Sequence, residues 1–127
     1  MSGNAINSAH HRLQSFFIQL YHLKDTLISD PKSGLSKTVV ESAISTDPRL
    51  ALLADLANLD KHSRLTRPPR SSDVPVIGSA KGQAPGSGGG WRLRLEIIHQ
   101  GRTRDGLDVA GEAMDAWRNQ LHAWGII

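Results

Sequence analysis

The sequence predicts a mainly helical protein: a small helical bundle of three main helices and one short helix, with a β-hairpin before the C-terminal helix. In three long segments, apolar residues recur at the spacing of helices that bury one face. Residues 91–99 instead alternate apolar and polar side chains, as a strand with one buried face does. The length of 127 residues suits a single domain over 1–127. The predicted helices cover residues 5–28, 35–45, 48–65 and 108–124, and the predicted hairpin pairs 91–99 with 102–104.

The first predicted helix, residues 5–28, has a broad apolar face interrupted by a few polar residues. His11 and His22 are eleven residues apart, close to three turns, so they share one side, and Asp25 follows one turn later. Pro31 lies just beyond the helix and helps to end it. Because the apolar face is broad, a second copy of the chain could cover part of it, and we therefore expect a homodimer.

A short helix is expected at 35–45, although two adjacent valines in it also suit a strand. The central helix, 48–65, has a clear start, since Asp47 is a favoured N-cap residue and Pro48 a favoured first helical residue. Four leucines at helical spacing give this central helix an apolar stripe. They are Leu52, Leu53, Leu56 and Leu59.

The central helix also carries a polar stripe. Asp55, Asn58 and His62 are spaced i, i+3 and i+7, so they line one side of a helix. Lys61 lies beside them. A His and an Asn on a leucine-rich helix are the main feature of this sequence that needs an explanation.

The polar sides of the first and central helices would meet if the two helices pack antiparallel. His22 and Asp25 would then approach Asp55 and its neighbours on the stripe. An imidazole beside a carboxylate can act as a general base, and an amide can orient a substrate or an oxyanion. The same groups would equally form a hydrogen-bonded network between helices, because buried polar groups need partners. Both interpretations, a structural network and a binding or catalytic site, stay open.

A metal site is a third interpretation of these residues. Two histidines and two carboxylates can hold zinc or manganese, which would make the chain a metal-dependent hydrolase. Their spacing matches neither the His-Glu-x-x-His motif nor the Glu-x-x-His pairs of di-iron bundles. We therefore predict no metal and no cofactor. The residues in question are His22, Asp25, Asp55 and His62.

Residues 67–90 are rich in Pro, Gly and Ser and show no periodicity, so we expect a flexible loop within the domain. Connections of this length are usually functional or disordered. Three arginines gather where the loop starts, and they are either solvated or able to contact phosphate. They are Arg64, Arg67 and Arg70.

The hairpin and the last helix complete the bundle. A lone hairpin is marginally stable in water, so it must lie on the helices. Asp105 or Asp108 can cap the last helix, and Gly125 can end it. Trp117 and Trp124 are seven residues apart on its apolar face, where we expect both in the core.

Composition restricts the classes of function. The absence of cysteine excludes disulfides and thiolate chemistry and suits a reducing cytoplasm. The N-terminus lacks the pattern of a secretory signal, and no apolar run approaches the roughly 20 residues that span a bilayer. A net charge of +3 permits an acidic partner such as RNA without requiring one. We therefore expect a cytoplasmic protein without membrane contact.

Two segments together carry a family resemblance: FFIQLYHLKDTL at 16–27 and LLADLANLDKH at 52–62. They resemble a group of small bacterial proteins in which a YHL-x-D helix precedes a D-L-A/C-N-x-x-K-H helix. That group is similar to HEPN-type (higher eukaryote and prokaryote nucleotide-binding) helical domains, which occur in toxin–antitoxin, phage-defence and RNA-processing systems. The resemblance implies a helical bundle. Active HEPN members pair an Arg and a His across a dimer to cleave RNA.

By position, the resemblance makes His62 the catalytic histidine and Asn58 its polar neighbour. The arginine of active members is expected four to six positions earlier. Those positions hold Ala57, Leu56 and Asp55, so the arginine is missing. The resemblance therefore implies a HEPN-like scaffold without the usual catalytic pair.

A second Arg–His pair at similar spacing, Arg94 and His99, lies in a predicted strand, where an odd offset points the two side chains to opposite faces. We therefore expect a HEPN-like interaction or accessory protein in bacterial defence or a toxin–antitoxin system. Its expected partner is another protein or a second copy, with RNA as a further partner. The alternative is a metal-independent ribonuclease that uses His62 with Asn58 and Lys61, and the second alternative is the metal-dependent hydrolase.

Overall fold

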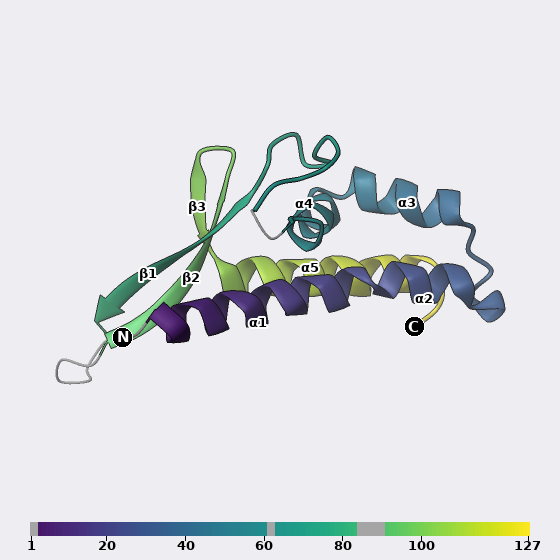
Figure 1. Cartoon of the computed structure of the whole chain (residues 1–127). Coiled ribbons are helices and arrows are strands. Elements are labelled where there is room, and N and C mark those ends of the chain that lie inside the picture. Colours follow the sequence, from purple (N-terminus) through teal and green to yellow (C-terminus); the bar gives the residue numbers. More distant parts are fainter. Residues whose placement is uncertain (1–2, 61–62, 84–90) are drawn as a thin grey trace.

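The computed structural model describes residues 3–60, 63–83 and 91–127. The chain is mainly helical, with a small antiparallel sheet of three strands before the C-terminal helix (Figure 1). None of the helices in the described ranges combines the length and apolarity needed to cross a bilayer. In chain order the elements are α1 (Gly3–Tyr21), α2 (Leu23–Ser29), a 3-10 turn (Pro31–Ser33), α3 (Lys37–Thr46), α4 (Pro48–Ala57), β1 (Val76–Gln83), β2 (Trp91–His99), β3 (Arg102–Asp105) and α5 (Gly106–Ala123).

The first predicted helix is helical along its length but is divided at His22 into α1 and α2, which follow one another in nearly the same direction (Figure 1). The His22 main-chain carbonyl accepts a 3.0 Å hydrogen bond from the N–H of Asp25, three residues later. This i to i+3 bond tightens the turn locally, as in a 3-10 helix. Leu27 on α2 is buried, so the second segment still faces the core.

The starts of α3 and α4 follow the sequence closely. Ser36 caps α3 by accepting a hydrogen bond from the N–H of Val39 at 3.2 Å. Asp47 caps α4 by accepting from the N–H of Arg49 at 2.9 Å, and Pro48 takes the first helical position. The predicted helical, rather than extended, state of 35–45 is thus confirmed with bounds shifted by one or two residues.

The predicted end of the central helix at residue 65 is wrong, since α4 ends at Ala57 with Asn58 as its C-cap. Beyond it, the N–H of Asp60 donates to the carbonyl of Arg64 at 2.7 Å, and the N–H of Arg64 donates to the Asp60 carboxylate at 3.0 Å. A short acidic side chain thus offers the main chain an alternative to the helical ladder. Ser63, with a φ of 58°, has a left-handed backbone conformation.

The expected flexible loop of 67–90 contains strand β1, which the sequence analysis missed. β1 pairs antiparallel with β2, with Val76 opposite Ile98 and Gln83 opposite Trp91. Its small residues hide the alternation that would reveal a strand, and pairing with β2 supplies what local propensity does not. The predicted strands β2 and β3 are present, so the hairpin is the second half of a sheet of order β1-β2-β3.

Helix α5 begins directly where β3 ends. Asp105 is the last residue of β3 and also the N-cap of α5, and its carboxylate accepts from the N–H of Leu107 at 2.8 Å. The helix therefore starts two residues before the predicted Asp108. At its other end, Gly125 has a φ of 73°, and the N–H of Ile126 donates to the carbonyl of Leu121 at 2.9 Å. This is the Schellman termination that a glycine permits.

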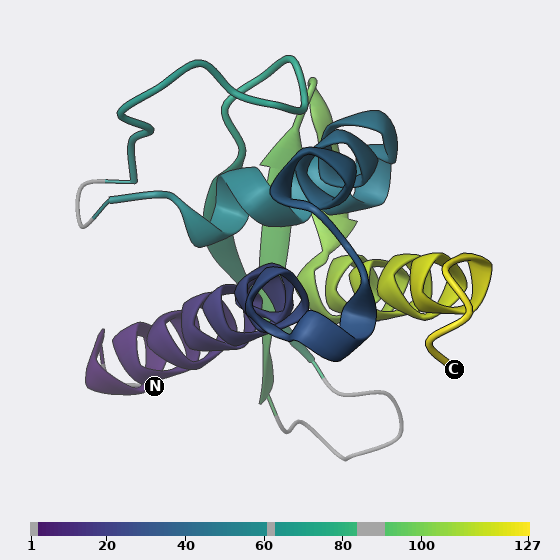
Figure 2. The ribbon, with the colours of Figure 1, turned by 90° about the vertical axis from the view of Figure 1, so that its right-hand side faces the viewer.

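Helix α4 forms the centre of the core, since every residue from 50 to 56 is buried. It packs on α1, α3 and α5, and the helices lie on one side of the sheet (Figures 1 and 2). Ile77 and Ile97 are buried on the side of the sheet that faces the helices. Trp117 is buried and Trp124 packs against the core, as the sequence predicts for both.

Candidate functional site

The central feature of the candidate site is the carboxylate of Asp55 on α4, which is only 3% exposed. Its Oδ1 accepts a 2.9 Å hydrogen bond from the main-chain N–H of Arg70. Its Oδ2 accepts from the main-chain N–H of Ser71 at 2.9 Å and also from the Ser71 hydroxyl. The carboxylate therefore binds the segment that connects α4 to the sheet.

The predicted polar stripes of the first and central helices do not meet. His22 and Asp25 are exposed at the junction of α1 and α2, whereas Asp55 is buried. Among the described residues, no side-chain hydrogen bond joins either of them to Asp55 or Asn58. The reason is geometric: Asp55 faces the following segment of its own chain, and the first helix contributes Gln14 instead, whose amide donates to the carbonyl of Leu56.

Of the predicted catalytic residues Asn58, Lys61 and His62, the structure describes only Asn58. Asn58 is half-buried at the C-cap of α4, where its N–H donates to the carbonyls of Ala54 and Asp55. His62 and Lys61 lie outside the described residues. Because α4 ends at Ala57, the expected continuous helical face from Asp55 to His62 does not exist.

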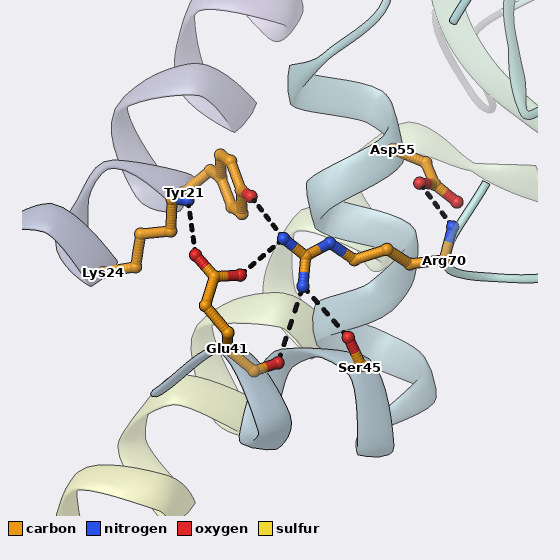
Figure 3. Close-up of polar contacts among 6 residues, drawn as sticks. All are labelled: Tyr21, Lys24, Glu41, Ser45, Asp55 and Arg70. Carbon is orange, nitrogen blue, oxygen red and sulfur yellow. Dashed lines mark hydrogen bonds and ion pairs between the residues drawn. The ribbon is translucent and has the colours of Figure 1, made fainter. Parts of the chain in front are cut away.

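The three arginines of the loop differ in their surroundings. Arg64 and Arg67 are exposed, and the only ion pair of Arg64 within the described ranges is a long one, 3.9 Å to Asp60. Arg70 is instead half-buried and points back onto α3 (Figure 3). Its Nη2 lies 2.5 Å from Oε2 of Glu41.

Arg70 also reaches two hydroxyl groups. Its Nη2 donates to the Tyr21 hydroxyl at 3.2 Å, and its Nη1 donates to the Ser45 hydroxyl at 3.0 Å (Figure 3). On the far side of Glu41, Lys24 Nζ lies 2.9 Å from Oε1 and 4.8 Å from the centre of the Tyr21 ring, which allows a cation–π contact. We call these five residues, Tyr21, Lys24, Glu41, Ser45 and Arg70, the Arg70 cluster.

The charges of the Arg70 cluster shift one another's ionisation. Burial by itself would raise the pKa of Glu41, but hydrogen bonds from Lys24 and Arg70 outweigh it, so the pKa lies below the ordinary glutamate value. Burial would likewise lower the pKa of Lys24 and of Arg70, and the hydrogen bond that each makes with Glu41 raises both instead. All three groups are therefore charged near neutral pH.

The connecting segment is also tied to the turn between β2 and β3. Nε2 of His99 lies 3.0 Å from the Ser71 hydroxyl oxygen, and the Gln100 side-chain amide donates to the Ser71 carbonyl at 3.0 Å. The main-chain N–H of Gln100 donates to the Asp73 carboxylate at 2.9 Å. Residues 70–73 are thus held between α4 and the sheet.

A serine between a carboxylate and an imidazole invites comparison with a hydrolase nucleophile. The Ser71 hydroxyl has a single proton, which it donates to Asp55. The hydrogen in the contact with His99 must then come from the imidazole, so His99 is not placed to take the Ser71 proton. The trio of Asp55, Ser71 and His99 is an anchoring arrangement for the segment.

Sequence analysis missed most of the Arg70 cluster. Tyr21 and Lys24 are one helical turn apart on the chain, and so are Glu41 and Ser45, but nothing in the spacing indicates that the two pairs meet. The resemblance did include Tyr21 and Lys24, within the segment 16–27, without assigning either a role.

Comparison with protein-family models, with curated proteins and with solved structures finds no match to this chain. Within the part of the chain that the structure describes, no three His, Asp or Glu side chains are grouped so that they could hold a metal ion.

Proposed function

We propose that this chain is a binding module, a HEPN-like helical interaction or accessory protein of the bacterial cytoplasm, and that its partner is another protein. The sequence resemblance suggests defence or toxin–antitoxin systems as the setting. The proposal places the partner on the face of the sheet that the helices leave open.

The observation that carries this proposal is a row of exposed apolar side chains on that open face. Val76 of β1 is 45% exposed and lies directly opposite Ile98 of β2, which is 40% exposed. On the neighbouring strand β3, Thr103 is the residue paired with Ile98. Val74, which precedes β1 by two residues, is also 40% exposed. Contiguous exposed apolar side chains of this kind favour a protein-binding surface.

The polar residues of the candidate site bind one another within the chain, which also favours binding over catalysis. Asp55 is engaged by Arg70 and Ser71, and the Arg70 side chain is engaged by Glu41. These groups are better explained as anchors that hold residues 70–73 beside the sheet. Residues 70–73, next to the open face, are then already ordered before a partner binds. Binding therefore costs less conformational entropy than it would if this loop had to become ordered.

A photo-crosslinking residue at position 76 tests this proposal in cells, with the same residue at exposed position 118 on α5 as the control. We expect a discrete protein adduct from position 76 only, identified by mass spectrometry and lost when Ile98→Asp is added. An adduct of twice the chain mass identifies a second copy as the partner. Equal labelling from positions 76 and 118, or labelling insensitive to Ile98→Asp, contradicts the proposal.

The ribonuclease alternative is tested separately. Purified wild type and His62→Ala are incubated with total RNA, with and without a chelator. RNA loss that occurs only with the wild type and resists the chelator would favour the metal-independent nuclease with Asn58 and Lys61 as neighbours. Loss that the chelator prevents would favour the metal-dependent hydrolase. The binding-module proposal expects intact RNA in every sample.

A further inference from the structure

The Arg70 cluster has a surplus of positive charge. Lys24 and Arg70 are two cations, and Glu41 is the one carboxylate that pairs with both, so the cluster carries a net charge of +1. The side chains of Lys24, Arg70 and Glu41 are 18%, 19% and 23% exposed, so each is in partial contact with solvent. In such a half-buried place the surplus charge is screened less than on an open surface.

The cluster also has hydrogen-bond donors in excess of acceptors. The hydroxyl oxygens of Tyr21 and Ser45 each accept a hydrogen bond from Arg70, which leaves both O–H protons free to donate. Among the residues that the structure describes, neither hydroxyl donates a side-chain hydrogen bond. Arg70 uses both Nη atoms in the cluster, and its Nε–H has no acceptor in the same described ranges.

The Glu41 carboxylate indicates which chemistry suits these donors. Its two oxygens bridge Lys24 Nζ and Arg70 Nη2, at 2.9 Å and 2.5 Å (Figure 3). An oxyanion therefore already bridges the two cations, and the remaining donors would serve a second one. A phosphate dianion offers more charge than a carboxylate and three terminal oxygens, which matches a guanidinium, an ammonium and two hydroxyls.

We propose that the Arg70 cluster is a binding site for a small phosphate, either free or as the terminal phosphate of a nucleotide, with Tyr21, Lys24, Ser45 and Arg70 as its donors. The site draws on α1, α2, α3 and the segment after α4. A bound phosphate therefore fixes the Arg70 side chain. Because Arg70 belongs to residues 70–73, which Asp55 and the sheet hold, the phosphate also stabilises that segment. This inference is independent of the partner on the open face of the sheet.

The test is an NMR titration of the arginine Nε–H signals with inorganic phosphate, compared with sodium chloride at the same ionic strength. We expect the Arg70 signal to shift saturably with phosphate and not with chloride. Glu41→Gln raises the net charge of the cluster to +2 and removes the competing carboxylate, so we expect tighter binding by about tenfold. Tyr21→Phe and Lys24→Gln each remove a donor and should weaken binding by about tenfold.

The matched control is Glu96→Gln, which frees Arg94 from an ion pair that involves only one cation. It should leave phosphate binding unchanged. A parallel titration with AMP distinguishes the source: tighter binding of AMP than of inorganic phosphate indicates a nucleotide, and equal binding indicates the free ion. The inference is overturned if neither wild type nor Glu41→Gln shows a saturable Arg70 shift. It is equally overturned if Tyr21→Phe, with an unchanged melting temperature, binds as tightly as the wild type.

Discussion

The carboxylate of Asp55 accepts a hydrogen bond of 2.9 Å from the main-chain N–H of Arg70, fifteen residues further along the chain. This contact joins the buried centre of the helical layer to a segment with no secondary structure of its own. Main-chain N–H groups that lie away from water need an acceptor, and here a side chain provides it. Asp55 therefore acts in this protein as an anchor for the loop.

Replacing Asp55 with alanine should destabilise the fold by about 2–3 kcal/mol, because two main-chain N–H groups and the Ser71 hydroxyl lose their acceptor. Asp55→Asn keeps one carbonyl oxygen and should cost less. Urea unfolding followed by circular dichroism measures both. The control is Asp25→Ala at an exposed position, where we expect a change within about 0.5 kcal/mol. Equal losses at Asp55 and Asp25 would contradict the anchoring role.

The lowered pKa of Glu41 predicts how stability depends on pH. Because the pKa is depressed in the folded state, the ion pairs with Lys24 and Arg70 contribute fully above the ordinary glutamate pKa of 4.5. That contribution is lost as the pH falls through the folded pKa. Wild type should therefore exceed Glu41→Gln in unfolding free energy by about 1 kcal/mol at pH 7, and the difference should disappear in acid.

Thermal unfolding of wild type and Glu41→Gln in buffers from pH 7 to pH 2.5 measures this difference directly. Glu96→Gln serves as the control, since Glu96 pairs within the described residues with Arg94 only, at 3.5 Å, and that arginine side chain is 60% exposed. An exposed pair of this kind contributes little. A difference between wild type and Glu41→Gln that persists in acid would show that packing, not charge, stabilises the cluster.

The Ser71 hydroxyl is expected to act as a structural bridge and not as a nucleophile. Ser71→Ala removes its bonds to Asp55 and His99 and should destabilise the fold by about 1–2 kcal/mol. Wild type should not be labelled by a serine-reactive fluorophosphonate. Ser42→Ala, at an exposed position on α3, is the control and should leave stability unchanged. Stoichiometric labelling of Ser71 would contradict this assignment and would favour a hydrolase with Ser71 as its nucleophile.

The parts of the fold that the sequence predicts are those fixed by neighbouring residues. The Asp47-Pro48 start of α4 and the alternation in β2 depend on the side chains in those segments alone. Strand β1 was missed because its glycines and alanine carry little pattern and its conformation comes from pairing with β2. The end of α4 was placed too late because leucine spacing continues to Leu59, while Asp60 closes a competing turn.

The candidate site was predictable only in part, for a related reason. Asp55 and Arg70 were both singled out by the sequence, but for a helix face and a phosphate-contacting loop, not for contact with each other. Their meeting depends on the chain folding back after α4, which no local spacing encodes. Glu41 and Ser45 occupy ordinary positions on a short helix, and only the packing of α3 beside α2 and α4 brings them to Arg70.

Two glycines of α5 should respond in opposite ways to the same substitution. Gly106 begins α5 where the helix meets α1 and β2, and an added Cβ would lie 2.9 Å from Cδ2 of Leu13 and 3.2 Å from the carbonyl oxygen of Leu95. The main-chain oxygen cannot move without disturbing β2, so Gly106→Ala should destabilise the fold by about 1–2 kcal/mol. At Gly111 the added Cβ would meet no heavy atom within 4 Å in the part of the chain that the structure describes, and the alanine variant should stabilise the helix by about 0.5–1 kcal/mol. Melting temperatures that move in the same direction for both variants would contradict the close contact at the start of α5.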